Sequence, residues 1–279
     1  MAECARNGSV APKGLFVGLC TKDIVYYTDE IPKKNHKIKT DDFATYIGGP
    51  AANAAITYAA LGGDATLATC LGMGPESEAI TKELETYGVK VLNFAAYETT
   101  PNTACILVSN DGSRSIISGQ HPFTPNCSFA TDVYDFILFD CNQQEISQDI
   151  LAQSTGQTIV LDAGSVKPGI EAFLQKADIV IASEDFKDAM GEGLFGMKCD
   201  APHKVITRGE RTMLYNDKEL PVKTVTAVDT LGAGDIFHGA FCFAHFYLGK
   251  SVEDALLYAA EVAGESVKYR GPRAWMAKR

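Results

Sequence analysis

Short apolar runs and longer amphipathic stretches alternate along the first half of the chain. The runs predict strands at residues 15–19, 66–70, 89–94, 104–108 and 115–117. A helix is expected from Pro50, which suits the first helical position, to the stop at Gly62-Gly63. A second amphipathic helix is expected over Pro75–Tyr87, and the alternation in Ile24–Tyr46 predicts exposed strands or a hairpin.

The second half changes to short apolar runs separated by helical stretches, which is the pattern of a βαβ sheet with parallel strands. Its strands are expected at residues 136–139, 158–161, 179–182 and 204–207. A hairpin with strands at 213–215 and 220–222 should follow around Asn216-Asp217. Because ligands bind beyond the carboxyl ends of parallel strands, the polar residues found there are candidate site residues: Asp140, Asn142, Asp162, Ser183, Glu184 and residues 208–211.

Two helices are predicted near the carboxyl end. Apolar residues recur at helical spacing after Asp235 as far as Leu248, and Gly249 supplies a stop. His238 lies one turn beyond Asp235, and we expect it to be a packed core histidine rather than a second base. The last helix should begin at Ser251.

Composition narrows the class of protein. The chain has 279 residues, a formal net charge of −10 and a pI near 5.0, which argues against nucleic-acid and acidic-membrane partners. Its eight cysteines are scattered along the chain. This favours reduced cysteine side chains that are buried as small hydrophobic groups, in a protein of a reducing compartment. Residues 1–13 lack the apolar segment of a secretion signal and should form a disordered tail, and no apolar run is long enough to span a bilayer. We therefore expect a cytoplasmic protein.

Candidate chemistry lies in the stretch Asp229-Thr230-Leu231-Gly232-Ala233-Gly234-Asp235, which joins a carboxylate to a glycine-rich turn that opens a helix. The free N–H groups of this turn and the positive end of the helix dipole would form an anion site. A carboxylate at such a site indicates phosphoryl transfer to an alcohol, in which Asp235 takes the hydroxyl proton. Spacing alone leaves open that Asp229 and Asp235 are ordinary acids at a helix start.

That stretch, followed by Ile236-Phe237-His238-Gly239-Ala240-Phe241, resembles the carboxyl-terminal signature of the ribokinase-like, or PfkB, carbohydrate kinases. A second family signature is present at Gly48-Gly49-Pro50-Ala51-Ala52-Asn53-Ala54-Ala55, and the resemblance extends from about Gly14 to about Trp275. It implies a three-layer α/β/α fold with a mainly parallel central sheet, in a kinase domain at 14–279. It also implies a small β-lid from about 22–47 and 94–120, and a homodimer formed through the lids.

The resemblance implies roles for individual residues of the acceptor site. Asp235 would be the catalytic base, with Gly232, Ala233 and Gly234 holding the phosphoryl group. The residues implied at the sugar are Asp23, Gly48, Gly49 and Asn53, although Asn53 also suits a local helix cap. Arg114, just past a turn, is either a fork donor to a phosphate or acidic substrate group, or a surface arginine.

On the nucleotide side, residues 205–210 resemble the family turn in which a glycine lets the backbone pass near ATP. The residues expected at ATP are Thr207, Gly209, Thr230, Gly232, Gly234, Ala260 and Gly264. Ala260 and Gly264 would leave room for adenine, but ordinary close packing explains them equally well.

The expected metal sites differ in part from the family pattern. Ser183-Glu184-Asp185-Phe186 stands where relatives usually have Asn-x-x-Glu, so Glu184 would reach Mg²⁺ through water. The alternative is that Glu184 and Asp185 are first-turn helix acids. Asp229 should shape its loop, and K⁺ activation stays open because many relatives hold a monovalent cation in this region.

The resemblance implies an ATP- and Mg²⁺-dependent carbohydrate kinase. Its acceptor would be a hydroxymethyl group of a small sugar, such as the ketose fructose or a related sugar or sugar acid. Two alternatives stay open: a nucleoside kinase on the same scaffold, and a non-catalytic protein that senses a sugar or nucleotide. The altered Asn-x-x-Glu site favours the sensing protein, whereas the intact stretch from Asp229 to Asp235 argues against it.

Overall fold

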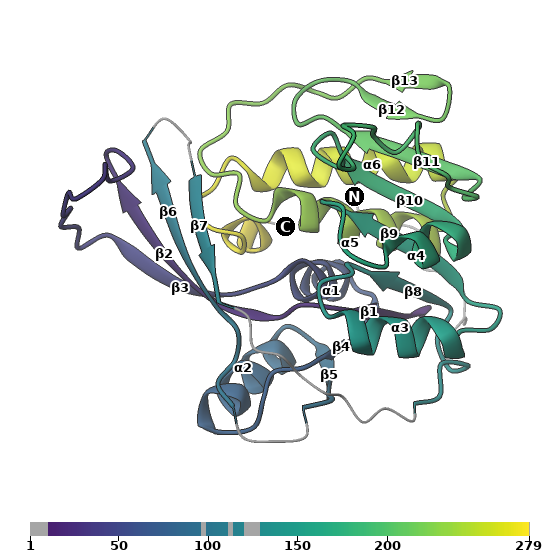
Figure 1. Ribbon diagram of the computed structural model, residues 1–279, viewed down its shortest axis with the longest axis horizontal. Coiled ribbons are helices and arrows are strands. Elements are labelled where there is room, and N and C mark those ends of the chain that lie inside the picture. The colour runs from purple at the N-terminus through teal and green to yellow at the C-terminus, as the bar shows by residue number, and fades with distance from the viewer. Residues whose placement is uncertain (1–10, 96–98, 111–113, 120–128, 279) are drawn as a thin grey trace.

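The computed structural model describes residues 11–95, 99–110, 114–119 and 129–278, and within these ranges nine strands form a large sheet and four a small one. Figure 1 shows helices covering both faces of the large sheet. Of the expected tail at 1–13, residues 1–10 lie outside the described ranges, and the chain enters the first strand at Lys13. No helix in the described ranges has both the length and the apolar character needed to cross a bilayer.

The large sheet is mainly parallel, as the sequence predicts. Its strands are β1 (Lys13–Val17), β4 (Asp64–Thr69), β5 (Val89–Asn93), β8 (Phe136–Phe139), β9 (Thr158–Ala163), β10 (Ile179–Ser183), β11 (His203–Thr207), β12 (Met213–Tyr215) and β13 (Lys218–Leu220). Their order is β13-β12-β11-β10-β9-β8-β1-β4-β5. Every pair from β11 to β5 is parallel, and β12 and β13 add an antiparallel edge.

Helices form the outer two layers. One face packs against α1 (Pro50–Ala60), α2 (Pro75–Thr86), α5 (Ala233–Cys242) and α6 (Val252–Ser266), and the other against α3 (Gln144–Gln153) and α4 (Ile170–Lys176). A π-helical turn, Phe243–Tyr247, continues α5, and a 3₁₀ turn, Ala274–Lys278, follows α6. The three-layer α/β/α architecture is therefore confirmed.

Two apolar cores explain why the central strands are continuous apolar runs. Phe16 of β1 packs into the core that contains α1 and α5, whereas its neighbours Leu15 and Val17 pack into the core that contains α3 and α4. Because a covered parallel sheet buries both faces, the strands lack the polar–apolar alternation of a half-exposed sheet. The carboxyl ends of β1, β8 and β9 then meet at one edge of the sheet.

The small sheet contains β2 (Thr21–Thr28), β3 (Phe43–Gly48), β6 (Thr103–Ser109) and β7 (Arg114–Ser118), in the order β3-β2-β6-β7. It stands to one side of the large sheet in Figure 1. These strands fall largely in the ranges expected for a lid, of which residues 96–98, 111–113 and 120 lie outside the described part of the chain. That the small sheet closes over a substrate stays a prediction.

Two expectations are wrong in detail. The chain between β10 and β11 forms turns rather than a helix, so Glu184 and Asp185 are not first-turn helix acids. The absence of a helix there is explained by the closely spaced glycines at 191, 193 and 196, because glycine is unfavourable inside helices. The last hairpin strand occupies Lys218–Leu220 rather than 220–222, because Asn216 adopts a positive φ of 51° and closes a tight turn.

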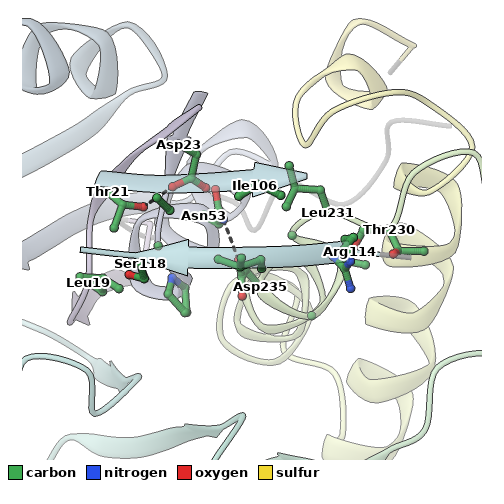
Figure 2. A pocket seen from close by; sticks show the side chains of 17 residues that line it. Leu19, Thr21, Asp23, Asn53, Ile106, Arg114, Ser118, Thr230, Leu231 and Asp235 are labelled. Atoms are coloured by element: carbon green, nitrogen blue, oxygen red, sulfur yellow. Dashed lines mark hydrogen bonds between the residues drawn. The ribbon is translucent and has the colours of Figure 1, made fainter. Parts of the chain in front are cut away.

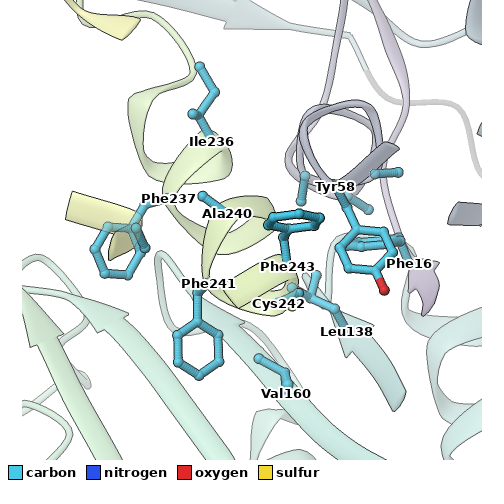
Figure 3. Packing of buried hydrophobic residues seen from close by; sticks show 14 of the residues in the cluster. Phe16, Tyr58, Leu138, Val160, Ile236, Phe237, Ala240, Phe241, Cys242 and Phe243 are labelled. Carbon is cyan, nitrogen blue, oxygen red and sulfur yellow. The ribbon is translucent and has the colours of Figure 1, made fainter. Parts of the chain in front are cut away.

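The packing of α5 against α1 and the sheet positions the future site. Figure 3 shows Phe243, at the start of the π-helical turn, beside Tyr58 and Phe16, while Phe241 of α5 points toward Val160 of β9. On the side of α5 that faces α1, a Cβ built on Gly239 would lie 2.3 Å from the carbonyl oxygen of Ala54 and 2.7 Å from Cβ of Thr57. The two helices therefore touch backbone to backbone at this point.

We predict that Gly239→Ala lowers the free energy of unfolding by about 1–3 kcal/mol, because the new methyl group forces α1 and α5 apart. This loss should outweigh the gain of about 1 kcal/mol that alanine brings to a helix interior. Urea unfolding measures the change. Gly193→Ala is the matched control, since its nearest foreign atom would be the Phe186 carbonyl oxygen at 3.6 Å. Equal stability of the Gly239 variant and the parent would contradict the close contact.

Candidate active site

A cavity of about 350 Å³ lies where the small sheet meets the amino-terminal ends of α1 and α5. Figure 2 shows side chains from the small sheet and from the starts of both helices converging on it. The residues that line it are Leu19, Thr21, Asp23, Gly49, Pro50, Asn53, Ala104, Ile106, Arg114, Ile116, Ser118 and residues 230–235. Most of the acceptor-site residues expected from the sequence are thus brought together, with Gly48 directly behind them.

The turn before α5 has the geometry of an anion site. Gly232 adopts a positive φ of 73° as the residue preceding the helix, and a Cβ on Gly234 would meet nothing within 4 Å. The backbone at Gly234 is therefore open to the cavity, where the helix dipole favours negative charge. The Ala233 N–H already donates to the Thr230 carbonyl oxygen at 3.2 Å, so its share in binding an anion is the smaller one.

Asp235 lies at the inner end of this turn, partly exposed toward the cavity. Its Oδ2 accepts a hydrogen bond of 2.6 Å from Nδ2 of Asn53, which Figure 2 shows as a dashed line. Burial, reinforced by the negative charge of Asp162, raises the pKa of Asp235 from 3.8 to about 7, against the opposing effects of Asn53 and His238. A carboxylate with a pKa near neutrality is suited to general-base catalysis.

A buried histidine and a second acid support Asp235 from behind. His238 is 6% exposed, which confirms that it is a packed core residue. Its Nδ1 lies 2.7 Å from the Gly234 carbonyl oxygen and 3.5 Å from Oδ2 of Asp162, while Nε2 faces the Ile181 carbonyl oxygen at 3.3 Å. Burial raises the pKa of Asp162 as well. The pair links α5 to the ends of β9 and β10.

Asp23 projects from β2 and supplies the second carboxylate of the cavity. It is 8% exposed, accepts a 2.6 Å hydrogen bond from Oγ1 of Thr21, and has a pKa that burial raises. Gly48, two residues beyond the partner of Asp23 on β3, lies so close that a Cβ there would be 1.8 Å from Oδ2 of Asp23. Gly49 has a φ of 93°, and its Cβ would lie 2.3 Å from the Leu19 carbonyl oxygen. Both glycines therefore permit close approach of backbone and carboxylate.

Asn53 does not cap its own helix. Gly49 occupies the capping position of α1 without any side-chain cap, so the local-cap interpretation of Asn53 is wrong. The amide is 5% exposed and instead bridges Asp235 to Arg273, whose Nη2 donates to Oδ1 of Asn53 at 2.5 Å. The sequence analysis did not identify Arg273, because no periodic pattern or motif marks a basic residue beyond the last helix.

The small sheet reaches the same turn through Arg114. This residue begins β7, lines the cavity, and donates from Nη1 to the Thr230 carbonyl oxygen at 3.2 Å. The side chain is exposed at the cavity mouth, so both interpretations of Arg114 stay open.

Asp229 ties the loop together rather than facing the cavity. Its Oδ1 accepts from the Leu231 N–H at 2.9 Å, and its Oδ2 accepts from the Gly271 N–H at 2.9 Å and the Tyr27 hydroxyl at 3.2 Å. Three donors on one carboxylate favour the loop-shaping role and leave little room for a cation ligand. The bond from Tyr27 also connects β2 to this loop.

Three of the residues expected at ATP, Thr230, Gly232 and Gly234, line the cavity, whereas the other four lie on other elements. Thr207 ends β11 beside the end of β10, and the Glu184 N–H donates to its carbonyl oxygen at 3.1 Å. The Glu184 carboxylate pairs with Arg211, which lowers its pKa, so it is ionised and solvent-facing. Gly209 follows with a φ of 62°, while Ala260 and Gly264 belong to α6 and lie apart from the acceptor cavity. Their contact with a nucleotide stays a prediction.

One further acid, Asp140, has a structural use. It is 1% exposed and accepts hydrogen bonds from the backbone N–H groups of Leu19, Ala51 and Asn142 at 2.8–3.0 Å. This carboxylate fixes the start of α1 to the ends of β1 and β8. The sequence indicated Asp140 as a candidate site residue because it directly follows a predicted parallel strand.

Comparison with known proteins adds a family to this geometry. The family model described as pfkB family carbohydrate kinase matches residues 12–123 and 147–279. The ribokinase of Bacillus subtilis is 28% identical over 283 residues, covering 94% of this chain and 95% of that protein. The deoxyribokinase of Salmonella typhi is 28% identical over 292 residues, covering 91% and 92%. A ketohexokinase of Mus musculus is 23% identical over 291 residues, covering 92% and 96%.

Solved structures show the same fold. The ribokinase of Cryptococcus neoformans in complex with ADP has a TM-score of 0.77 at 22% identity, covering 97% of this chain and all (100%) of that one. The ribokinase of Thermotoga maritima has a TM-score of 0.76 at 21% identity, covering 95% and 96%. These similarities confirm the fold that the two sequence signatures imply.

The raised pKa of Asp235 predicts a pH-dependent cost to stability. Between about pH 4 and pH 7 the folded protein keeps a proton on this carboxyl that the unfolded chain has lost, so stability falls as pH rises through this window. Asp235→Asn removes the penalty. Urea unfolding measures the difference in the free energy of unfolding between the variant and the parent. This difference should be on the order of 2 kcal/mol more favourable to the variant at pH 7.5 than at pH 4.5.

Asp217→Asn, in the exposed hairpin turn, is the matched control and should show no such gain. A constant difference between the Asp235 variant and the parent at both pH values would contradict the electrostatic environment described.

Proposed function

This chain belongs to the pfkB family of carbohydrate kinases, and we propose that it transfers the γ-phosphoryl group of ATP to a hydroxymethyl group of a small sugar. Phosphotransfer to an alcohol is the reaction of this family. The acceptor and the residue roles are our proposal.

The observation that favours this function is the position of Asp235. One cavity contains this carboxylate, the open backbone at Gly234 at the start of α5, and the polar groups of Asp23 and Asn53. A sugar hydroxyl within hydrogen-bond reach of Asp235 would therefore also lie beside the site that favours an anion.

In the proposed step, one hydroxyl group of the sugar receives the phosphoryl group. The acceptor oxygen attacks the γ-phosphorus, the bond from that phosphorus to the β–γ bridging oxygen breaks, and ADP leaves. The hydroxyl proton passes to Asp235, while the Gly234 N–H and the dipole of α5 stabilise the charge on the transferred group. Asp23 and Asn53 orient the sugar, and this positioning supplies much of the rate.

Exclusion of water belongs to the same proposal. Arg114 of β7 contacts Thr230, and Tyr27 of β2 contacts Asp229, so the small sheet already touches the turn that would bind the phosphoryl group. A sheet held there would shield the reacting groups from water, which competes with the sugar as acceptor. In this role the Arg114 guanidinium would face the transferred phosphoryl or an acidic substrate group. A homodimer through the small sheets is part of the proposal, supported by the exposed Ile117 on β7.

ATP is the proposed donor, supported by the ADP complex of the Cryptococcus ribokinase. Thr207, Gly209, Thr230, Gly232, Gly234, Ala260 and Gly264 would contact it. Mg²⁺ would neutralise its phosphates, and Glu184, ionised and solvent-facing, fits a contact through water. For K⁺, the hydrogen bonds on Asp229 fit a shaped loop better than a direct carboxylate ligand.

The experiment is ADP release with Mg²⁺-ATP across a panel of ketoses, aldoses, sugar acids, sugar phosphates and nucleosides, with and without K⁺. We expect turnover with one sugar class, and a fall of about 10³-fold in Asp235→Asn because the base is lost while the fold remains. The affinity for ATP should stay close to that of the parent. Asp217→Asn should retain full turnover.

Three outcomes would contradict the proposal. Turnover on nucleosides alone would make the protein a nucleoside kinase. No ADP release with any compound of the panel, combined with a sugar that raises the melting temperature, would indicate a sensing protein. Near-normal turnover in Asp235→Asn would remove this residue from its role as base.

A further inference from the structure

Arg273 lies beyond α6, directly before the 3₁₀ turn Ala274–Lys278 near the carboxyl end of the chain. Its Nη2 donates to the Ile47 carbonyl oxygen at 2.8 Å and to Oδ1 of Asn53 at 2.5 Å. Its Nη1 donates to the Pro272 carbonyl oxygen at 3.3 Å. All three acceptors are neutral oxygen atoms, and none of the carboxylates in the described ranges forms an ion pair with it.

The chemistry of the two side chains fixes the direction of the Asn53 amide. A guanidinium can only donate hydrogen bonds, so the amide atom that faces Arg273 must be oxygen. The amide nitrogen then faces Asp235, where it donates to Oδ2 at 2.6 Å. With the amide reversed, two donors would meet at Arg273 and two acceptors at Asp235.

We propose that Arg273 is a positioning residue, which holds the Asn53 amide in the orientation that donates a hydrogen bond to Asp235. The inference rests on the proposed function, in which Asp235 is the base. Arg273 acts through Asn53 and does not line the cavity itself.

The charges around both residues favour this role. The groups that face Arg273 are Asp23 of β2, Glu83 and Tyr87 of α2 and its cap, and Asp235 of α5. Asp235 in turn faces Asp162 and Asp140 from the strand ends and His238 from its own helix. Two buried acids thus oppose ionisation of Asp235.

Two other groups favour ionisation of Asp235. Asn53 donates a hydrogen bond to the ionised form, and His238 counteracts the effect of the two acids on the pKa. Arg273 orients that donor. Loss of Arg273 should therefore make Asp235 harder to ionise.

The test is a ¹³C NMR titration of the Asp carboxyl carbons in the ligand-free protein, with Asp235 assigned by its absence in Asp235→Asn. In Arg273→Met we expect the titration midpoint of Asp235 to rise by about one pH unit, because the charged form loses an oriented donor. Lys268→Met is the matched control. It removes one cation from the same terminal segment, where Lys268 pairs at the surface with Glu265, and should leave the midpoint unchanged.

A second background tests whether Arg273 acts through Asn53. In Asn53→Ala, the further change Arg273→Met should move the Asp235 midpoint by less than about 0.3 unit, since the intermediary is already absent. An equal shift in both backgrounds would overturn the proposal, as would an unchanged midpoint in Arg273→Met. If that variant does not fold, Arg273→Lys keeps the charge without the planar fork, and we expect a smaller upward shift. A midpoint equal to that of the parent would then overturn the proposal.

Turnover separates this inference from the proposed function. Where the parent is active, Arg273→Met should have a lower kcat at pH 6.5, recover toward the parent at pH 8.5, and keep the parent's KM for ATP. A uniform loss at both pH values would contradict positioning of the base. Inactivity of the parent would count against the proposed function, while the NMR titration would still decide the role of Arg273.

Discussion

The site depends on one contact, the backbone-to-backbone packing of α5 against α1. Because Gly239 has no side chain, α5 reaches the carbonyl oxygen of Ala54, and the amino-terminal ends of the two helices come together. Asn53 on one helix and Asp235 on the other are then close enough for a 2.6 Å hydrogen bond. Aromatic packing at the far end of α5 and the Asp140 carboxylate at the start of α1 anchor the two helices in this arrangement.

Electrostatics at this junction work against stability. Asp23, Asp162 and Asp235 all have raised pKa values because protein surrounds them, and burying a carboxylate is unfavourable unless donors compensate it. Asn53, His238 and the oriented backbone supply that compensation in part. The two extensive apolar cores provide the stability that lets such a site persist, which is the usual relation between a fold and its active site.

Local signals allowed much of the fold to be predicted. Short apolar runs marked the parallel strands, and the glycine-rich turn before α5 marked the anion site, because both depend on neighbouring residues. The tight turn at Asn216 and the glycines near 193 shifted or removed elements that the apolar pattern favoured. Arg273 could not be predicted, since its role comes from a contact with Asn53, far away in the chain.

The most direct test of the account is a crystal structure with Mg²⁺, ADP, aluminium fluoride and the preferred acceptor. Aluminium fluoride takes the place of the phosphoryl group in transfer. We expect one acceptor hydroxyl oxygen within hydrogen-bond distance of the Asp235 carboxylate, and a fluorine atom beside the Gly234 N–H. An acceptor whose hydroxyl groups all lie away from Asp235, or an ADP whose phosphates lie away from the start of α5, would contradict the account.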